Sequence, residues 1–430
     1  MLKKILGTFG TRVCCALISF GLLIFNSRQF GPEGVGNIDL FILGVSILQI
    51  LTSFFGGSSL VYMLPRHDRF QLLFLSYFFG IAVNGLGSVL MIHFKLVPSE
   101  YLGQLLLASV CFSLYAVNTS VMLSEERIRL YNLFVLSPWL LLVLSLWIQM
   151  YFFHYRDVGC YMNAYTGSYA VLAVLSFCFM RNAPGKHSLK GMGNVLRKMI
   201  SYGFAIQVAN LSQLLNYRLS YYVVDRSMGR APLGLYGTNT KLCESVWLLP
   251  KSVATIQYAR ISNAGNDRLY AKKVTLAFFK LTLFFSLCCT LLLVLFPAPW
   301  IAAVFGSKFA AIKPLMWVSA FGIVLLSGNV ILSHYFAGTG NYKVNTTASL
   351  LGLGISLLFL IPIYCLQPGS IRFSFSQWVC LATVCSYAGS FSYTLYRFCK
   401  ETGATWSDFL YRKEDRLRFQ EEIHRIFRNQ

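Results

Sequence analysis

Long apolar segments follow one another along almost the whole chain and constrain its fold more than any other feature. An α-helix rises 1.5 Å per residue, so about 20 residues cross the ~30 Å hydrocarbon core of a bilayer. Backbone polar groups find no water in that core, and only helices or closed barrels satisfy them there. Twelve helical spans are predicted, at residues 8–29, 38–63, 71–94, 102–123, 131–152, 160–180, 200–224, 234–258, 273–296, 311–337, 344–366 and 377–398. The predicted fold class is all-α, a polytopic membrane protein with about 12 transmembrane helices.

The composition supports the membrane class. Of the 430 residues, 56% are hydrophobic and 12% are charged, and the mean hydropathy is +0.58, whereas a soluble domain is about 25% charged. The net charge of +21 raises nucleic acid as a partner, but neither a compact basic domain nor an aromatic stacking platform accompanies it, so nucleic acid is not expected. The twelve cysteines lie mostly in apolar runs without metal-ligand spacing, and no redox or metal role is assigned to them.

Positive charge is divided unevenly between the two sets of predicted loops. Because spans alternate in direction, both termini share a side with 24 Lys and Arg, counting Lys273 and Arg397 at span ends. The opposite loops carry 8, and five more lie inside spans. Cytoplasmic loops collect Lys and Arg. We therefore expect both termini in the cytoplasm.

The longest internal loop, 181–199, separates six predicted spans from six others. This predicts an N-lobe at 1–190, a C-lobe at 191–400 and an amphipathic cytoplasmic tail at 401–430, which is either solvated or bound to the inner leaflet or a partner. A short signature recurs at the start of the second span of each half, which hints at duplicated lobes. Its residues are Arg28, Gly31, Gly34 and Gly36 in the first half, and Arg226, Gly229, Gly234 and Tyr236 in the second.

Charged residues inside spans are expensive and by default face a cavity or a partner. Only one acid, Glu244, lies deep in a span. The cations within spans are Arg12, Arg218, Lys241, Lys251 and Lys280. We expect Lys280 to reach toward the membrane surface, and Arg12 has the same option. An excess of fixed positive charge favours a polyanionic ligand.

Polar residues share one face on each of two consecutive predicted spans, at about 100° per residue. On span eight they are Lys241, Glu244 and Lys251, and on span seven they are Gln207, Asn210 and Arg218. Two interpretations remain open: the two faces line a substrate cavity, or they hold neighbouring helices together. Glu244 either bridges Lys241 at i,i+3 or is a coupling site for H⁺ or Na⁺.

Several segments in order along the chain resemble Wzx-type flippases of the multidrug/oligosaccharidyl-lipid/polysaccharide (MOP) exporter superfamily. The resemblance covers about residues 1–400. Its N-terminal motifs are Gly7–Thr8 through Arg12, Arg28 with Gly31–Pro32–Glu33–Gly34–Val35–Gly36, and Phe55–Gly56–Gly57–Ser58–Ser59–Leu60. Its C-terminal motifs are Asn216–Tyr217–Arg218–Leu219, Leu233–Gly234–Leu235–Tyr236, and Lys241 through Pro250.

The resemblance implies two six-helix bundles related by a pseudo-two-fold axis, which alternate between inward- and outward-open states. It implies a non-enzymatic flippase of the bacterial inner membrane that moves an undecaprenyl-pyrophosphate-linked oligosaccharide for O-antigen, capsule or exopolysaccharide assembly, beside polysaccharide polymerase machinery. Arg12 and Arg218 match its arginines, and we expect them to contact substrate together with Lys241, Lys251, Gln207 and Asn210. No cofactor is expected beyond a coupling ion. The alternatives are a drug exporter of the same superfamily and a membrane glycan polymerase or glycosyltransferase; no nucleotide-binding, hydrolase or metalloprotease motif occurs.

Overall fold

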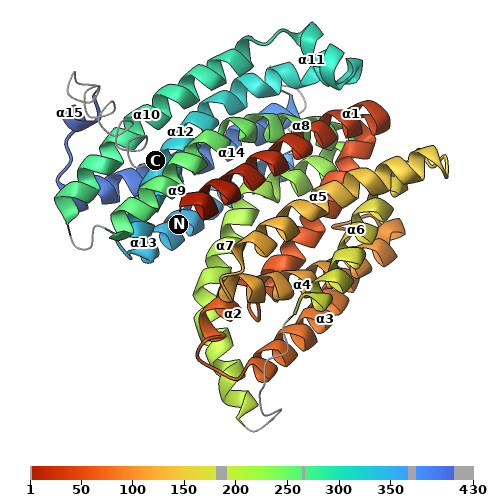
Figure 1. Ribbon diagram of the computed structural model, residues 1–430. Helices are drawn as coiled ribbons and strands as arrows, with labels where there is room; N and C mark the ends of the chain where they lie inside the picture. Colours follow the sequence, from red (N-terminus) through yellow and green to blue (C-terminus); the bar gives the residue numbers. More distant parts are fainter. Residues whose placement is uncertain (1, 181–190, 264–266, 367–373, 411–430) are drawn as a thin grey trace. The chain divides into compact units, whose positions relative to one another are not determined.

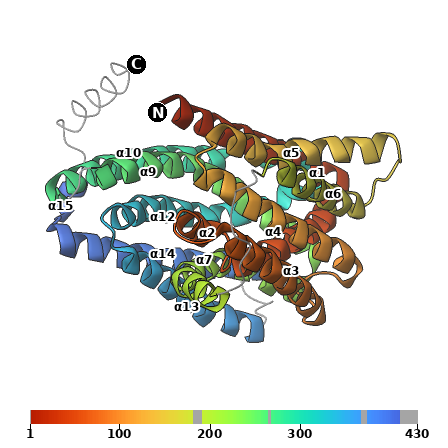
Figure 2. The same cartoon turned by 60° about the horizontal axis from the view of Figure 1, so that its bottom comes forward.

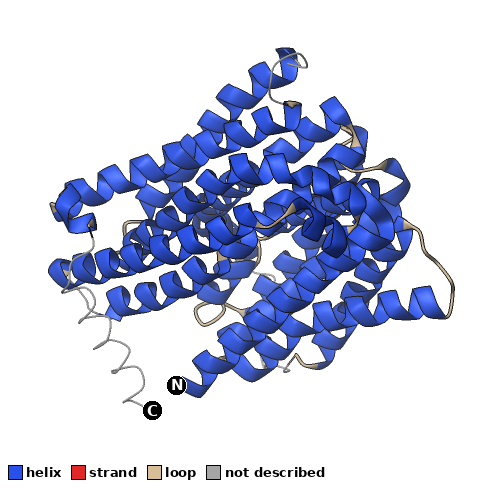
Figure 3. Ribbon diagram, turned by 90° about the horizontal axis from the view of Figure 1, so that it is seen from above, coloured by secondary structure: helices blue, strands red, loops and turns tan. Residues whose placement is uncertain are grey.

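The computed structural model describes residues 2–180, 191–263, 267–366 and 374–410, and all regular structure in these ranges is helical (Figure 3). The first half contains α1 (Leu2–Thr52), α2 (Gly57–Met63), α3 (Arg69–His93), α4 (Leu102–Ser124), α5 (Ile128–Tyr151) and α6 (Val158–Cys178). The second half contains α7 (Met192–Met228), α8 (Arg230–Val246), α9 (Leu248–Asn263), α10 (Arg268–Leu295), α11 (Ala298–Phe305), α12 (Lys313–Gly338), α13 (Tyr342–Leu366), α14 (Phe375–Thr402) and α15 (Trp406–Phe409).

Within the described residues, seven helical segments are long and apolar enough to cross a membrane. They are Gly10–Thr52, Arg69–His93, Ser99–Ser124, Ile128–Tyr151, Arg268–Leu295, Ser307–Gly338 and Tyr342–Leu366. The first of them contains most of two predicted spans. The predicted all-helical, multi-pass membrane class is therefore confirmed, while the count of twelve spans stays a prediction. The remaining predicted spans fall on α6, α7, α8 with α9, and α14, which carry more polar residues.

The chain divides into two compact units. The first comprises Met1–Leu214, Met228–Gly237 and Ala302–Phe309, and the second comprises Leu215–Ser227, Thr238–Ile301 and Ala310–Gln430. Helix α7 thus contributes residues to both units. The predicted lobes at 1–190 and 191–400 stay a prediction, and residues 181–190 and most of the predicted tail, 411–430, lie outside the described residues.

Each unit has its own apolar core. In the first unit α4 packs against α3 and α6, and α5 packs against α1 and α6 (Figure 1). Phe41, Leu48 and Met162 are fully buried there. In the second unit α12 and α14 run side by side, and α13 packs on α14 (Figure 2). Tyr335, Phe336 and Phe398 are fully buried in that core. These buried faces fix the helices that carry the polar residues described below.

The structure differs from the first two predicted spans at two places. The expected loop at 28–37 is instead a kink in one long helix, where Gly31 has φ +64° and Pro32 follows. Glycine tolerates this left-handed conformation, and proline fits the first turn of the helix that continues. The predicted span 38–63 also ends early, because α1 stops at Thr52 and α2 begins at Gly57, which has φ +54°.

The predicted span 234–258 is two helices, α8 and α9, separated at Trp247. Pro250 explains the break: it has no N–H for the carbonyl of Val246, and its ring would collide with that carbonyl in a continuous helix. The Trp247 N–H bonds to the Glu244 carbonyl at 3.0 Å instead, and the Lys251 N–H bonds to the Trp247 carbonyl at 3.1 Å. The assumption of one uninterrupted helical face for Lys241, Glu244 and Lys251 was therefore wrong.

The two copies of the repeated signature meet inside the first unit. A Cβ on Gly234 would lie 3.0 Å from the backbone nitrogen of Gly36 and still closer to the carbonyl of Pro32. Only glycine permits two helix backbones to approach this closely. The resembling positions of the two halves thus form one helix crossing between α1 and α8.

Candidate functional site

Arg218 on α7 and Glu244 on α8 form a two-pronged ion pair in the second unit. Both terminal guanidinium nitrogens donate, one to each carboxylate oxygen, and both distances are 2.7 Å. The two side chains are 22% and 26% exposed, so the pair is mostly enclosed but still reachable. Parallel N–H···O bonds of this kind combine charge with fixed geometry. The guanidinium also lies over the ring of Tyr221, with Arg218 Cζ 5.1 Å from the ring centre.

Lys251 and three aromatic side chains lie in the same unit. The Lys251 ammonium is 3.9 Å from the centre of the Trp247 ring, a distance at which a cation is attracted by the ring face. Tyr217 meets the rings of Trp247 and Tyr387 edge to face, with centroids 5.6 Å apart in each case. Trp247 and Lys251 are four residues apart, and the Lys251 N–H bonds to the Trp247 carbonyl at 3.1 Å, so the two side chains share one face of a helical turn.

The positive charges of Lys251 and Lys241 also act on the Glu244 carboxylate, after that of Arg218. We call Tyr217, Arg218, Lys241, Glu244, Trp247 and Lys251 the cation–aromatic cluster. It contains three cations and one carboxylate, so its formal charge is two positive units. Such a cluster attracts anions, and its Trp247 ring is buried in the core of the second unit beside the charges.

Asn216 anchors the same turn of α7 to its neighbours. The single hydrogen of the Ser386 hydroxyl is shared between the Asn216 side-chain oxygen and the Gly352 carbonyl, which lies 2.9 Å from the hydroxyl oxygen. A Cβ on Gly352 would come within 2.6 Å of the Asn216 amide nitrogen. Gly352 is therefore a close-packing position on α13, as expected for small residues between membrane helices.

Gln207 and Asn210 belong to the first unit, whereas Arg218 belongs to the second. The Gln207 amide nitrogen donates to the Ser53 carbonyl at 3.3 Å, and Asn210 donates to the Gln207 side-chain oxygen at 3.1 Å. Gln207 is buried and satisfies a backbone carbonyl at the break between α1 and α2. At Gln207 and Asn210 the observed contacts are those of a polar face that holds neighbouring helices together, the second of the two interpretations.

The other predicted cations lie on different elements. Arg12 is an exposed residue of α1 in the first unit, and Lys280 is a half-buried residue of α10 in the second. The structure thus brings together Arg218, Lys241, Lys251 and Glu244. These four residues belong to the second unit, whereas Arg12, Gln207 and Asn210 belong to the first.

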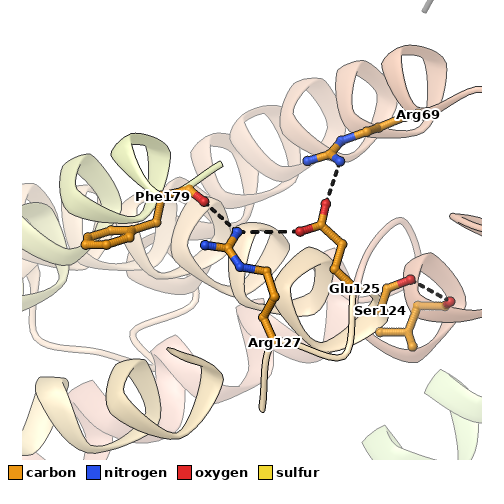
Figure 4. Close-up of polar contacts among 6 residues, drawn as sticks. Arg69, Ser124, Glu125, Arg127 and Phe179 are labelled. Atoms are coloured by element: carbon orange, nitrogen blue, oxygen red, sulfur yellow. Dashed lines mark hydrogen bonds and ion pairs between the residues drawn. The ribbon is translucent and has the colours of Figure 1, made fainter. Parts of the chain in front are cut away.

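A polar network in the first unit was missed by the sequence reasoning (Figure 4). Arg69 at the start of α3 donates to Glu125 at 2.6 Å, and Arg127 lies 3.5 Å from the other oxygen of that carboxylate. Arg127 also donates to the carbonyl of Phe179 at 2.7 Å. The network joins the ends of α3, α4 and α6. Its signal in the sequence was Glu125 beside Arg127 in the predicted loop 124–130, and Arg69 in the predicted loop 64–70, two loops that were used only to assign orientation.

No group of three or more His, Cys, Asp or Glu side chains in the described part of the chain is placed to hold a metal ion. The candidate site is therefore built from cations, aromatic rings and one carboxylate.

Comparisons with known sequences agree with this architecture. A family profile described as polysaccharide biosynthesis protein matches residues 167–314. The capsular polysaccharide biosynthesis protein CapF of Staphylococcus aureus is 22% identical over 405 residues, which cover 89% of this chain and 97% of CapF.

Comparisons with solved structures extend over nearly the whole chain. An inward-facing multidrug resistance transporter of the MATE family, from the MOP superfamily, has a TM-score of 0.68 at 12% identity and covers 91% of this chain and 96% of its own. The lipid II flippase MurJ in an inward closed conformation has a TM-score of 0.67 at 15% identity, over 95% of this chain and 89% of its own. The chain therefore has the same fold as these two transporters, and its similarity to polysaccharide biosynthesis proteins agrees with the expected resemblance to polysaccharide flippases.

Proposed function

We propose that this protein is a flippase that carries an undecaprenyl-pyrophosphate-linked oligosaccharide across the bacterial inner membrane for surface polysaccharide assembly. The observation that carries the proposal is the cation–aromatic cluster, in which Arg218, Lys241 and Lys251 outnumber the single carboxylate of Glu244. A pyrophosphate suits these cations, because Arg and Lys both bind phosphate oxygens through charge-assisted hydrogen bonds. The similarity to CapF favours a capsular product.

Movement of the substrate is proposed to be alternating access, with both termini in the cytoplasm and polysaccharide polymerase machinery as the receiving partner. Arg12, Gln207 and Asn210 are proposed to contact the substrate in the first unit. Coupling to H⁺ or Na⁺ is proposed to use Glu244, the acid that lies deep in a predicted span. The action is transport without covalent change of the substrate.

The test is deletion of the gene in its native bacterium, followed by analysis of surface glycan and of undecaprenyl-linked intermediates. We expect surface glycan to be lost and single repeat units to accumulate on the cytoplasmic leaflet. Complementation with the wild-type protein should restore export, and Arg218→Ala should not. Membrane levels of both proteins, measured by immunoblot, serve as the control.

The same experiment separates the alternatives. If single repeat units reach the periplasm but are not joined, the protein acts in polymerisation. Unchanged glycan would overturn the proposal and leave the drug exporter, which would then be tested by drug susceptibility of the deletion strain.

A further inference from the structure

The bidentate edge of Arg218 is occupied by a carboxylate of the same chain. Two terminal nitrogens of the guanidinium donate to the two oxygens of Glu244, each at 2.7 Å. A guanidinium binds phosphate through the same fork of parallel N–H groups. The edge that would recognise an anionic headgroup is therefore already filled in this structure.

We propose that Glu244 is an internal counter-anion, which a phosphate or pyrophosphate group must displace from Arg218 before it is bound. The inference rests on the proposed function, because it concerns how the same site selects its substrate. Arg218 then exchanges one anion for another and is never left unpaired in the membrane. An unpaired charge there is costly, so the pair with Glu244 stabilises the protein when no substrate is bound.

Displacement is feasible because the carboxylate keeps other cations near it when it leaves the guanidinium. Lys251 and Lys241 both act on Glu244, so the released carboxylate is not abandoned without positive charge. Removing one partner of a buried ion pair is otherwise strongly unfavourable. Arg218 is 22% exposed and Glu244 is 26% exposed, so the pair is not sealed from solvent.

Competition also provides selectivity. A monovalent anion offers Arg218 no more than Glu244 already does, so it gains little by displacing the carboxylate. A pyrophosphate carries more charge and more acceptor oxygens, and it can contact Arg218 and Lys251 together. The internal carboxylate weakens the binding of every ligand at Arg218 by the same factor, so it sets a threshold of affinity that only a ligand with further contacts exceeds.

The test uses the full chain in lipid nanodiscs and isothermal titration calorimetry with two probes, inorganic pyrophosphate and undecaprenyl pyrophosphate supplied in the disc. Glu244→Gln should bind each recognised probe about tenfold more tightly than the wild type, since a coupling between sites is typically 5- to 150-fold. Glu126→Gln is the matched control, because it removes the same charge from an exposed loop residue and should bind as the wild type does. In the double variant Arg218→Gln with Glu244→Gln the gain should vanish.

The outcomes are distinct. A gain with both probes indicates recognition of the pyrophosphate itself, and a gain with the lipid probe alone indicates that the lipid-linked form is required. Equal or weaker binding by Glu244→Gln overturns the inference, and so does a gain that survives loss of Arg218.

If Glu244→Gln does not fold, Glu244→Asp provides the test, because a side chain one methylene shorter cannot keep both bonds without a shift of the backbone. It too should bind more tightly, and unaltered affinity would overturn the inference. If Glu244→Gln does not bind the probes more tightly but repeat units are trapped in the deletion strain, the inference is wrong and the proposed function stands. If Glu244→Gln binds more tightly but the deletion strain has unchanged surface glycan, the proposed function is wrong.

Discussion

The interactions of Arg218 depend on the planar shape of the guanidinium as well as on its positive charge. A single charge at mid-membrane costs at least about 2.5–3.5 kcal/mol on insertion scales. Arg218 lies in a predicted span, and its two hydrogen bonds to Glu244 would offset such a cost. Lys251 lies over a ring instead, where a point charge is sufficient. Arginine and lysine are thus not interchangeable within the cluster.

We therefore predict that Arg218→Lys lowers glycan export about tenfold or more although the charge is kept, because a single ammonium replaces the planar fork. The readout is surface glycan in the complemented deletion strain, normalised to membrane protein level. Lys280→Gln is the comparison, since it removes a cation from α10 and should leave export within about twofold of wild type if that cation serves only the membrane surface. Full export by Arg218→Lys would exclude a role for the fork.

Glu125 accepts from two arginines in the first unit, whereas its neighbour Glu126 is exposed. Glu125→Gln should lower the free energy of unfolding by about 1 kcal/mol or less, because partly exposed ion pairs contribute modestly. Glu126→Gln changes the same charge one position away and should have no measurable effect. Thermal unfolding in detergent at low and high salt checks both, and an equal effect of the two variants would contradict the role given to the network.

At the scale of elements, the breaks in the helices position the functional residues. Pro250 interrupts the helix at Trp247, so that Lys251 belongs to α9 whereas Lys241 and Glu244 belong to α8. Gly31 and Gly57, both at positive φ, bend or end the segment that was predicted as two uniform spans. The crossing of α1 and α8 depends on the absence of side chains at Gly36 and Gly234.

Gly234→Ala should destabilise the first unit by about 1–3 kcal/mol, the usual range for overpacking, because the new methyl group would overlap the Pro32 carbonyl. Gly167→Ala on α6 is the matched control, since a Cβ there meets nothing within 4 Å, and alanine favours a helix by about 1 kcal/mol over glycine. The melting temperature should fall in the first variant and stay or rise in the second. Equal melting temperatures would show that the crossing is not tightly packed.

At the scale of the whole molecule, the charge distribution of 24 against 8 Lys and Arg is a property that no single element carries. It predicts orientation through the positive-inside rule. A green fluorescent protein fused after residue 430 should fluoresce, and alkaline phosphatase fused there should be inactive. Alkaline phosphatase fused within loop 153–159, on the opposite side, should be active. The reverse pattern would contradict cytoplasmic termini.

Much of the fold was readable from the sequence because hydrophobic length and charge distribution are local properties. Apolar runs of the right length must form helices in a membrane, so the positions of most helices, the all-α class and the family resemblance followed from the residues alone. The sequence also identified Arg218, Lys241, Lys251 and Glu244 as intramembrane charges that needed partners.

The pairing of those charges was decided only by tertiary structure. Arg218 and Glu244 are 26 positions apart, and periodicity along one helix cannot state which residue of another helix a side chain will meet. For the same reason the sequence predicted that Gln207 and Arg218 share one helical face, but it could not identify the Ser53 carbonyl in the first unit as the partner of Gln207. Side-chain partners follow from how whole helices pack, and that packing is a balance over all buried contacts.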